Sequence, residues 1–132
     1  MLTVEQRIKR HIMRTGDGPE ILADANMVCD FEDGESIDHV YDELQSEWLL
    51  QDGLEDFRCS GVETGLPCEY SRHYESESVA KQLDDGSWVG WTYWYGGGKF
   101  GDPQAIDWLE EAYDLDVIET QEMVTVRKFS KR

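Results

Sequence analysis

Residues 74–95 place the strongest constraint on the fold, because they read as two strands joined by a tight turn. Polar and apolar residues roughly alternate over residues 74–83, and residues 88–95 are rich in aromatic side chains that favour strands. The turn between them contains Asp85-Gly86, a pair that tolerates the positive φ angles of a hairpin. This pattern predicts an antiparallel hairpin, and the three glycines at 96–98 end its second strand.

The N-terminal part of the chain predicts helices. Thr3 and Gln6 have the spacing of a capping box, and Gly16 marks the end of the first amphipathic helix. A short helix or loop is expected over residues 20–25, and a brief strand over residues 27–31.

A second amphipathic helix is predicted from about Ser36 to Leu50. Its apolar positions recur with helical spacing and should form one buried face. They are Ile37, Val40, Tyr41, Leu44 and Trp48. The acidic residues of this segment fall mainly on the opposite, outward side.

The C-terminal part predicts a turn-rich loop over residues 59–70 and, after the hairpin, a third helix that opens at Asp102-Pro103. The apolar side of that helix would carry Ala105, Ile106, Leu109, Ala112 and Tyr113. One or two closing strands are expected over residues 115–118 and 123–129. The chain thus predicts one α+β domain over residues 1–132, with a small antiparallel sheet packed against two N-terminal helices. Residues 1–58 form its acidic helical half, and residues 70–130 its strand-strand-helix-strand half.

Charge is distributed very unevenly along this chain, whose formal net charge is −17. Residues 17–57 contain no lysine or arginine but fourteen aspartates and glutamates. Apolar residues are interspersed among them, so we expect a folded acidic surface and not a disordered tail. Such a surface should repel nucleic acids and anionic membranes and attract basic proteins.

The chain shows no signal peptide and no apolar run of membrane-spanning length. We therefore expect a cytoplasmic protein whose three cysteines are reduced. Cys59, Cys68 and His73 are the best candidates for a metal or catalytic site, but they lack the close cysteine or histidine pairs of structural zinc sites. We expect no cofactor and no enzymatic activity; a zinc-binding or small catalytic protein that uses these three residues is the alternative.

Aromatic residues fill the second strand of the predicted hairpin. Alternation along a strand places Trp91, Tyr93 and Tyr95 on one face with Val89, and Trp94 on the other face with Trp88 and Thr92. Large aromatic side chains are common both in protein cores and at interfaces. The strand is therefore either a central core strand or a partly exposed recognition surface, in which Trp91, Tyr93, Trp94 and Tyr95 would contact a partner.

Two segments resemble small uncharacterised proteins of bacteriophages and prophages. They are Ser71-Arg72-His73-Tyr74-Glu75 and the run from Asp85-Gly86-Ser87-Trp88-Val89-Gly90-Trp91-Thr92-Tyr93-Trp94-Tyr95 to Gly96-Gly97-Gly98-Lys99. The similarity continues through Pro103-Gln104-Ala105-Ile106-Asp107-Trp108 and Tyr113-Asp114-Leu115-Asp116-Val117 and covers the C-terminal half. This resemblance implies a phage accessory protein and no particular activity.

The acidic charge and the phage-like half together predict a protein that binds a basic host protein. Its carboxylates would occupy positions that phosphates fill in a nucleic acid, and would inhibit a defence or nucleic-acid-binding complex. The expected contact residues are Asp30, Glu32, Asp33, Glu35, Asp38, Asp42, Glu43 and Glu47. A hydrophobic interaction module that binds through the aromatic strand is a further alternative.

Overall fold

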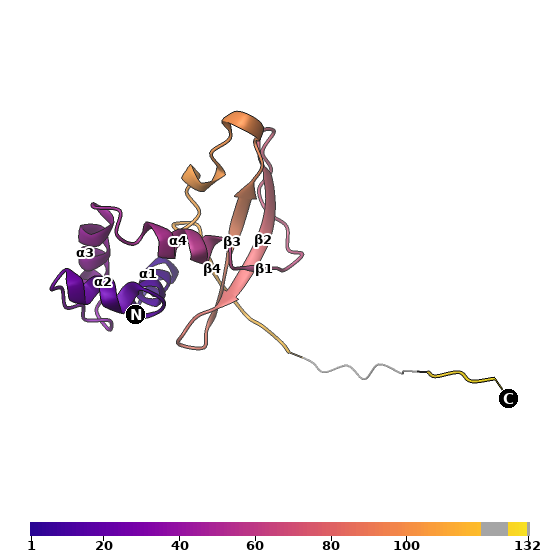
Figure 1. Ribbon diagram of the computed structural model, residues 1–132, viewed down its shortest axis with the longest axis horizontal. Helices are drawn as coiled ribbons and strands as arrows, with labels where there is room; N and C mark the ends of the chain where they lie inside the picture. The colour runs from indigo at the N-terminus through magenta and orange to yellow at the C-terminus, as the bar shows by residue number, and fades with distance from the viewer. Residues whose placement is uncertain (120–126, 132) are drawn as a thin grey trace.

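The computed structural model describes residues 1–119 and 127–131, and over these residues the chain has the predicted α+β fold (Figure 1). The four helices are α1 (Val4–Arg14), α2 (Gly18–Asp24), α3 (Gly34–Gln45) and α4 (Gln51–Arg58). The strands are β1 (Val62–Glu63), β2 (Glu75–Gln82), β3 (Trp88–Tyr95) and β4 (Tyr113–Leu115). Short 3₁₀ turns, η1 (Gly98–Phe100) and η2 (Pro103–Ala105), connect β3 to β4.

The four strands form one antiparallel sheet in the order β1-β2-β3-β4. The hairpin predicted from the sequence is its centre, with Val79 of β2 opposite Trp91 of β3. Gly86 has a φ angle of 89°, which explains why the turn needs glycine at this position. The β2–β3 arm extends beyond the helices at its far end (Figure 1).

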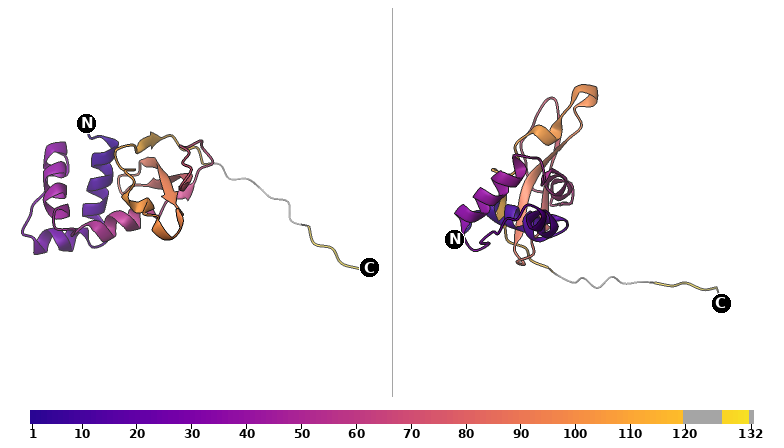
Figure 2. Two further views of the ribbon diagram at one scale, coloured as in Figure 1. Left: turned by 90° about the horizontal axis from the view of Figure 1, so that it is seen from above. Right: turned by 60° about the vertical axis from the view of Figure 1, so that its left-hand side comes forward.

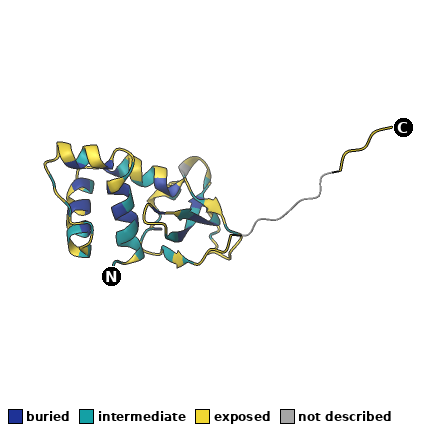
Figure 3. Ribbon diagram, turned by 90° about the horizontal axis from the view of Figure 1, so that it is seen from below, coloured by how far each residue is buried: buried dark blue, intermediate teal, exposed yellow. Residues whose placement is uncertain are grey.

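The helices lie on one side of the sheet, with α1 between α3 and the strands (Figure 2). The predicted capping box of α1 is present: the Thr3 hydroxyl accepts from the Gln6 backbone N–H at 3.1 Å, and the Gln6 side chain accepts from the Thr3 N–H at 3.0 Å. Buried positions gather on the inner sides of α1 and α3 and along the central strands (Figure 3).

One hydrophobic core joins the helical half to the sheet. The ring of Phe57, at the end of α4, lies 4.9 Å from the Trp91 ring of β3 and 6.0 Å from that of Trp108. All three side chains are buried. Because the core draws residues from both halves, neither half buries its apolar face without the other.

Several predicted elements are wrong at their ends or absent. The helix predicted to Leu50 ends at Gln45, because Trp48 adopts a φ angle of 61° that no right-handed helix contains. Residues 27–31 form a loop and turn instead of a strand. Residues 102–113 contain only the short turn η2, since Trp108 is drawn into the core and Tyr113 begins β4. The first closing strand is therefore earlier than predicted; the second, over 123–129, lies largely outside the described residues.

Helix α1 holds the hairpin turn through the basic residues of the N-terminus. Arg10 donates to the Asp85 carboxylate at 2.9 Å. The Arg14 guanidinium lies 3.2 Å from the Asp84 carboxylate. Arg7 donates to Ser87 at 3.1 Å and forms an ion pair with Asp114. The positive charges of α1 are thus paired within the fold.

Candidate protein-binding surface

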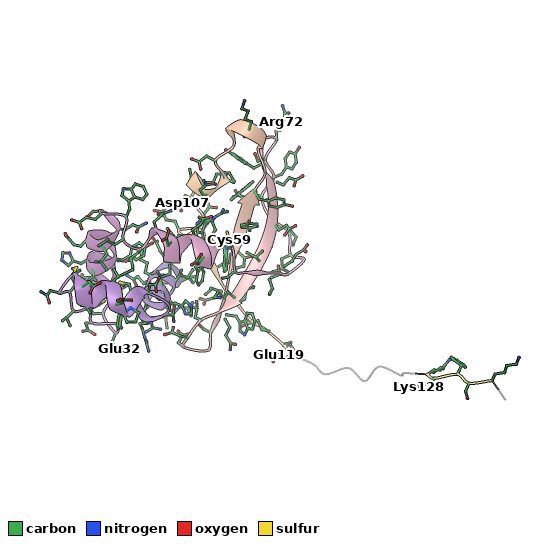
Figure 4. The ribbon with its side chains drawn as sticks, viewed as in Figure 1. Glu32, Cys59, Arg72, Asp107, Glu119 and Lys128 are labelled. Carbon is green, nitrogen blue, oxygen red and sulfur yellow. The ribbon has the colours of Figure 1, made fainter. Side chains whose placement is uncertain are left out.

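The predicted acidic contact residues lie on α3, on the loop that precedes it and, for Glu47, in the turn that follows it. Seven of the eight are exposed, and together we call them the acidic face. They are Asp30, Glu32, Asp33, Glu35, Asp42, Glu43 and Glu47. Figure 4 shows Glu32 at the outer edge of the helical layer, away from the sheet.

Asp38, the eighth predicted contact residue, is partly exposed and is paired within the fold. It is half-buried and accepts hydrogen bonds from the Gln6 amide at 2.9 Å and from the Lys9 ammonium at 3.1 Å. Burial alone would raise the pKa of Asp38, but these two hydrogen bonds outweigh it and lower that pKa. Asp38 therefore joins α3 to α1, and it is the one residue of the predicted contact set that forms an ion pair among the described residues.

The loop before α3 is ordered by its own polar groups. The Asp33 carboxylate caps α3 by accepting from the Glu35 backbone N–H at 3.2 Å. The Asp30 carboxylate accepts from the Glu32 N–H at 3.1 Å, and the Ser36 hydroxyl accepts from the Asp30 N–H at 2.9 Å. The acidic face consequently has a defined backbone along its whole length.

Little positive charge neutralises this surface. Among the described residues, only Asp38 and Glu55 of the fourteen carboxylates in the segment 17–57 form ion pairs. The cations of α1 are paired with other acids, so the acidic face keeps its negative field.

Trp48, in the turn between α3 and α4, is a surface residue that sequence reasoning missed. Its side chain is 72% exposed and its backbone is left-handed, although helical spacing predicted it to be buried. The neighbouring Leu49 is also exposed. Tryptophan is the residue most typical of interface anchors, and here it follows Glu47 of the acidic face directly.

The aromatic strand is mainly core. Trp91 is fully buried and donates from its indole N–H to the Arg58 carbonyl at 3.2 Å, and Trp94 is 6% exposed. Neither side chain presents a surface to a partner, so their prediction as contact residues was wrong. Tyr93 and Tyr95 are half-buried and stack with ring centres 5.6 Å apart, which leaves them as the accessible aromatic residues of this set.

Arg58 connects α4 to this strand. Its guanidinium donates to both carboxylate oxygens of Glu55 and to the Trp94 carbonyl at 2.8 Å, and lies 4.9 Å from the Tyr93 ring centre. The hydrogen bonds from Arg58 lower the pKa of Glu55, while burial and the nearby Cys59 thiol raise the pKa of Tyr93. The arrangement fixes the end of α4 against the sheet.

Cys59, Cys68 and His73 do not assemble into a metal site. Cys59 follows the last residue of α4, near the middle of the molecule. Arg72, the neighbour of His73, lies before β2, at the end of the β2–β3 hairpin that is farthest from its turn (Figure 4). The Cys68 sulfur lies 3.4 Å from the Ser76 hydroxyl. Within the described part of the chain, no three His, Cys, Asp or Glu side chains are placed to hold a metal ion. The zinc alternative therefore has no geometric support.

A pocket of about 340 Å³, which we call the helical pocket, opens where α1, α2 and α4 meet. Apolar side chains and three aspartates line it, together with His11 and Lys81. The His11 Nδ1 accepts from the Asp84 backbone N–H at 3.0 Å. Burial lowers the pKa of His11, so that its imidazole is neutral at pH 7. No spacing in the sequence indicated this pocket, because its walls come from three stretches far apart in the chain, residues 11–21, residues 49–60 and Lys81.

In the part of the chain that the structure describes, no helix has the length and apolar character needed to cross a membrane. Comparison of the chain with protein-family models, with characterised proteins and with solved structures finds no match.

Proposed function

We propose that this protein binds a basic protein through the acidic face and thereby excludes nucleic acid from it. One observation carries the proposal: seven exposed carboxylates form no ion pair among the described residues. A basic nucleic-acid-binding surface would meet carboxylates where it normally meets phosphates. The phage-like C-terminal half suggests that the target is a defence or nucleic-acid-binding complex in the host cytoplasm.

The packing behind the acidic face supports this function. Ile37, Val40 and Leu44 of α3 are buried, so that helix presents its acids from a fixed backing. A fixed surface loses less conformational entropy on binding than a disordered acidic tail does. Trp48 adds an exposed aromatic anchor beside the charges.

Charge reversal at the end of α3 and in the turn that follows it tests the proposal; we call the product the α3 variant. Asp42, Glu43 and Glu47 are changed together to lysine, and Asp38 is left intact because it stabilises the fold. The protein and the variant are used to capture partners from host lysate at low and high salt, and binding is repeated with the purified partner. We expect at least tenfold weaker binding by the variant, and steep salt dependence for the unmodified protein.

A matched control reverses three exposed acids elsewhere, Glu63, Glu111 and Asp116. It changes the net charge equally and should bind the partner much more tightly than the α3 variant. Equal affinity of the α3 variant and the unmodified protein for the partner would show that the acidic face is not the binding surface.

A second candidate is an apolar interaction module, which the stacked and accessible Tyr93 and Tyr95 favour. Binding of this kind would change little with salt and would fall when both tyrosines are replaced by alanine. The same capture experiment therefore separates the two functions.

A further inference from the structure

We propose that the helical pocket receives an arginine or lysine side chain of the basic partner. This inference rests on the proposed function and adds a specific recognition site to it. Leu49 lines the pocket and directly follows the exposed Trp48 in the chain, so a partner that contacts Trp48 would come close to the pocket.

The walls of the pocket suit the aliphatic part of a basic side chain. Ile12 of α1, Ile21 of α2 and Leu50 and Phe57 at the two ends of α4 line it. Arginine and lysine bury their methylene stems on apolar surface while their charged ends stay near polar groups. The volume of about 340 Å³ is sufficient for one such side chain.

The charge of the pocket suits the cationic end. Asp17, Asp52 and Asp56 line it, and none of them forms an ion pair with another described residue. Lys81 is the single opposing cation, and its ammonium lies 5.8 Å from the Phe57 ring centre. With His11 neutral, the lining carries a net charge of two negative units.

The C-terminal end of α1 adds to this preference. His11, Ile12 and Thr15 line the pocket, and α1 ends at Arg14. The carbonyl end of a helix carries partial negative charge and favours a nearby cation. The N-terminal ends of α2 and α4 also line the pocket, where the negative charges of Asp17 and Asp52 offset the positive ends of those helices.

Titration with a short peptide tests the site. The probe is acetyl-Gly-Arg-Gly-amide, and its control replaces arginine with citrulline, which has a similar shape without the charge. Binding is followed by NMR of the ¹⁵N-labelled full chain. We expect the arginine peptide to shift the backbone amides of Gly16, Gly18, Ile21 and Gly53, and the citrulline peptide to shift them much less.

Two pocket variants should change the affinity for the arginine peptide in opposite directions. Asp52→Asn with Asp56→Asn should weaken arginine binding roughly three- to tenfold, because each exposed ion pair contributes modestly. Lys81→Gln should tighten binding, because it removes the only competing cation of the lining. Asp42→Asn with Glu43→Gln removes the same charge from the acidic face and should leave the pocket shifts unchanged.

The proposal that the helical pocket binds a basic side chain is overturned if the arginine peptide does not shift the NMR signals of the pocket amides. It is also overturned if the arginine and citrulline peptides shift them equally. It is also overturned if the Asp52/Asp56 variant, with an unchanged melting temperature, binds the peptide as tightly as the unmodified protein. These results leave the acidic face intact, because reversal of Asp42, Glu43 and Glu47 tests that surface separately. Loss of partner binding in that α3 variant together with absent pocket shifts would refute the pocket alone.

Discussion

The Arg10 guanidinium of α1 and the Asp85 carboxylate of the hairpin turn lie 2.9 Å apart, 75 residues apart in the chain. Arg10 is buried and also donates to the Phe31 carbonyl at 3.3 Å, in the loop before α3. One side chain therefore ties the first helix to both the sheet and the acidic loop. The N-terminal basic residues stabilise the fold and do not form a separate positive surface.

Removal of this guanidinium should destabilise the protein. Arg10→Met keeps an apolar stem but removes the donor to the Asp85 Oδ2 and to the Phe31 carbonyl, while the Asp85 Oδ1 still accepts from Ser87. We expect a loss of about 1.5–3 kcal/mol, typical for hydrogen bonds to charged groups. Urea denaturation measures it, and Arg14→Met is the control because that side chain is 41% exposed. An Arg10 variant no less stable than the control would contradict the role of this contact.

Replacement of Trp48 should separate stability from binding. A left-handed backbone costs a non-glycine residue about 1–2 kcal/mol, and glycine removes that cost at some loss of chain entropy. We expect Trp48→Gly to stabilise the protein by about 0.5–1 kcal/mol and Trp48→Ala to change stability little. Both variants should bind the partner more weakly. Equal stability of the two variants in urea would show that the backbone conformation is not limiting.

The middle and the end of the aromatic strand should respond differently to truncation. Trp91→Ala removes a fully buried indole and should cost about 3–5 kcal/mol. Tyr95→Ala removes a partly exposed ring and one hydrogen bond to Glu77, and should cost much less stability than Trp91→Ala. Thermal and urea unfolding provide the comparison. A similar cost at both positions would mean that Tyr95 is as much a core residue as Trp91.

Stability should depend on pH through His11. Burial lowers the pKa of His11 in the folded state, so the unfolded chain binds a proton near pH 6.5 while the folded chain does not. The contribution of neutral His11 is present above that pH and is lost as pH falls through it. We therefore expect the stability difference between the unmodified protein and His11→Gln to shrink from pH 8 to pH 5.

The comparison with His11→Gln matters because the many carboxylates also titrate at acidic pH, and their effects cancel in the difference. Urea denaturation at several pH values measures both proteins. Parallel stability profiles would show that His11 does not contribute to the pH dependence.

The sequence by itself determined the elements whose signals are local. The hairpin follows from strand alternation around Asp85-Gly86, and the start of α1 from Thr3 and Gln6, because these preferences act over a few residues. The sequence also determined the unbalanced charge, and helical spacing placed most of the acids on the outside of α3.

Only the tertiary structure decided which of these side chains are exposed and unpaired, and so accessible to a partner. Trp94 is buried because the loop before β2 covers its side of the sheet, where Pro67 and Glu69 carbonyls accept from Ser78 and Ser76. Asp38 is paired because α1 packs against α3, and the helix predicted after Asp102 does not form because Trp108 enters the core. Each of these outcomes depends on contacts between segments far apart in the chain, which no local pattern encodes.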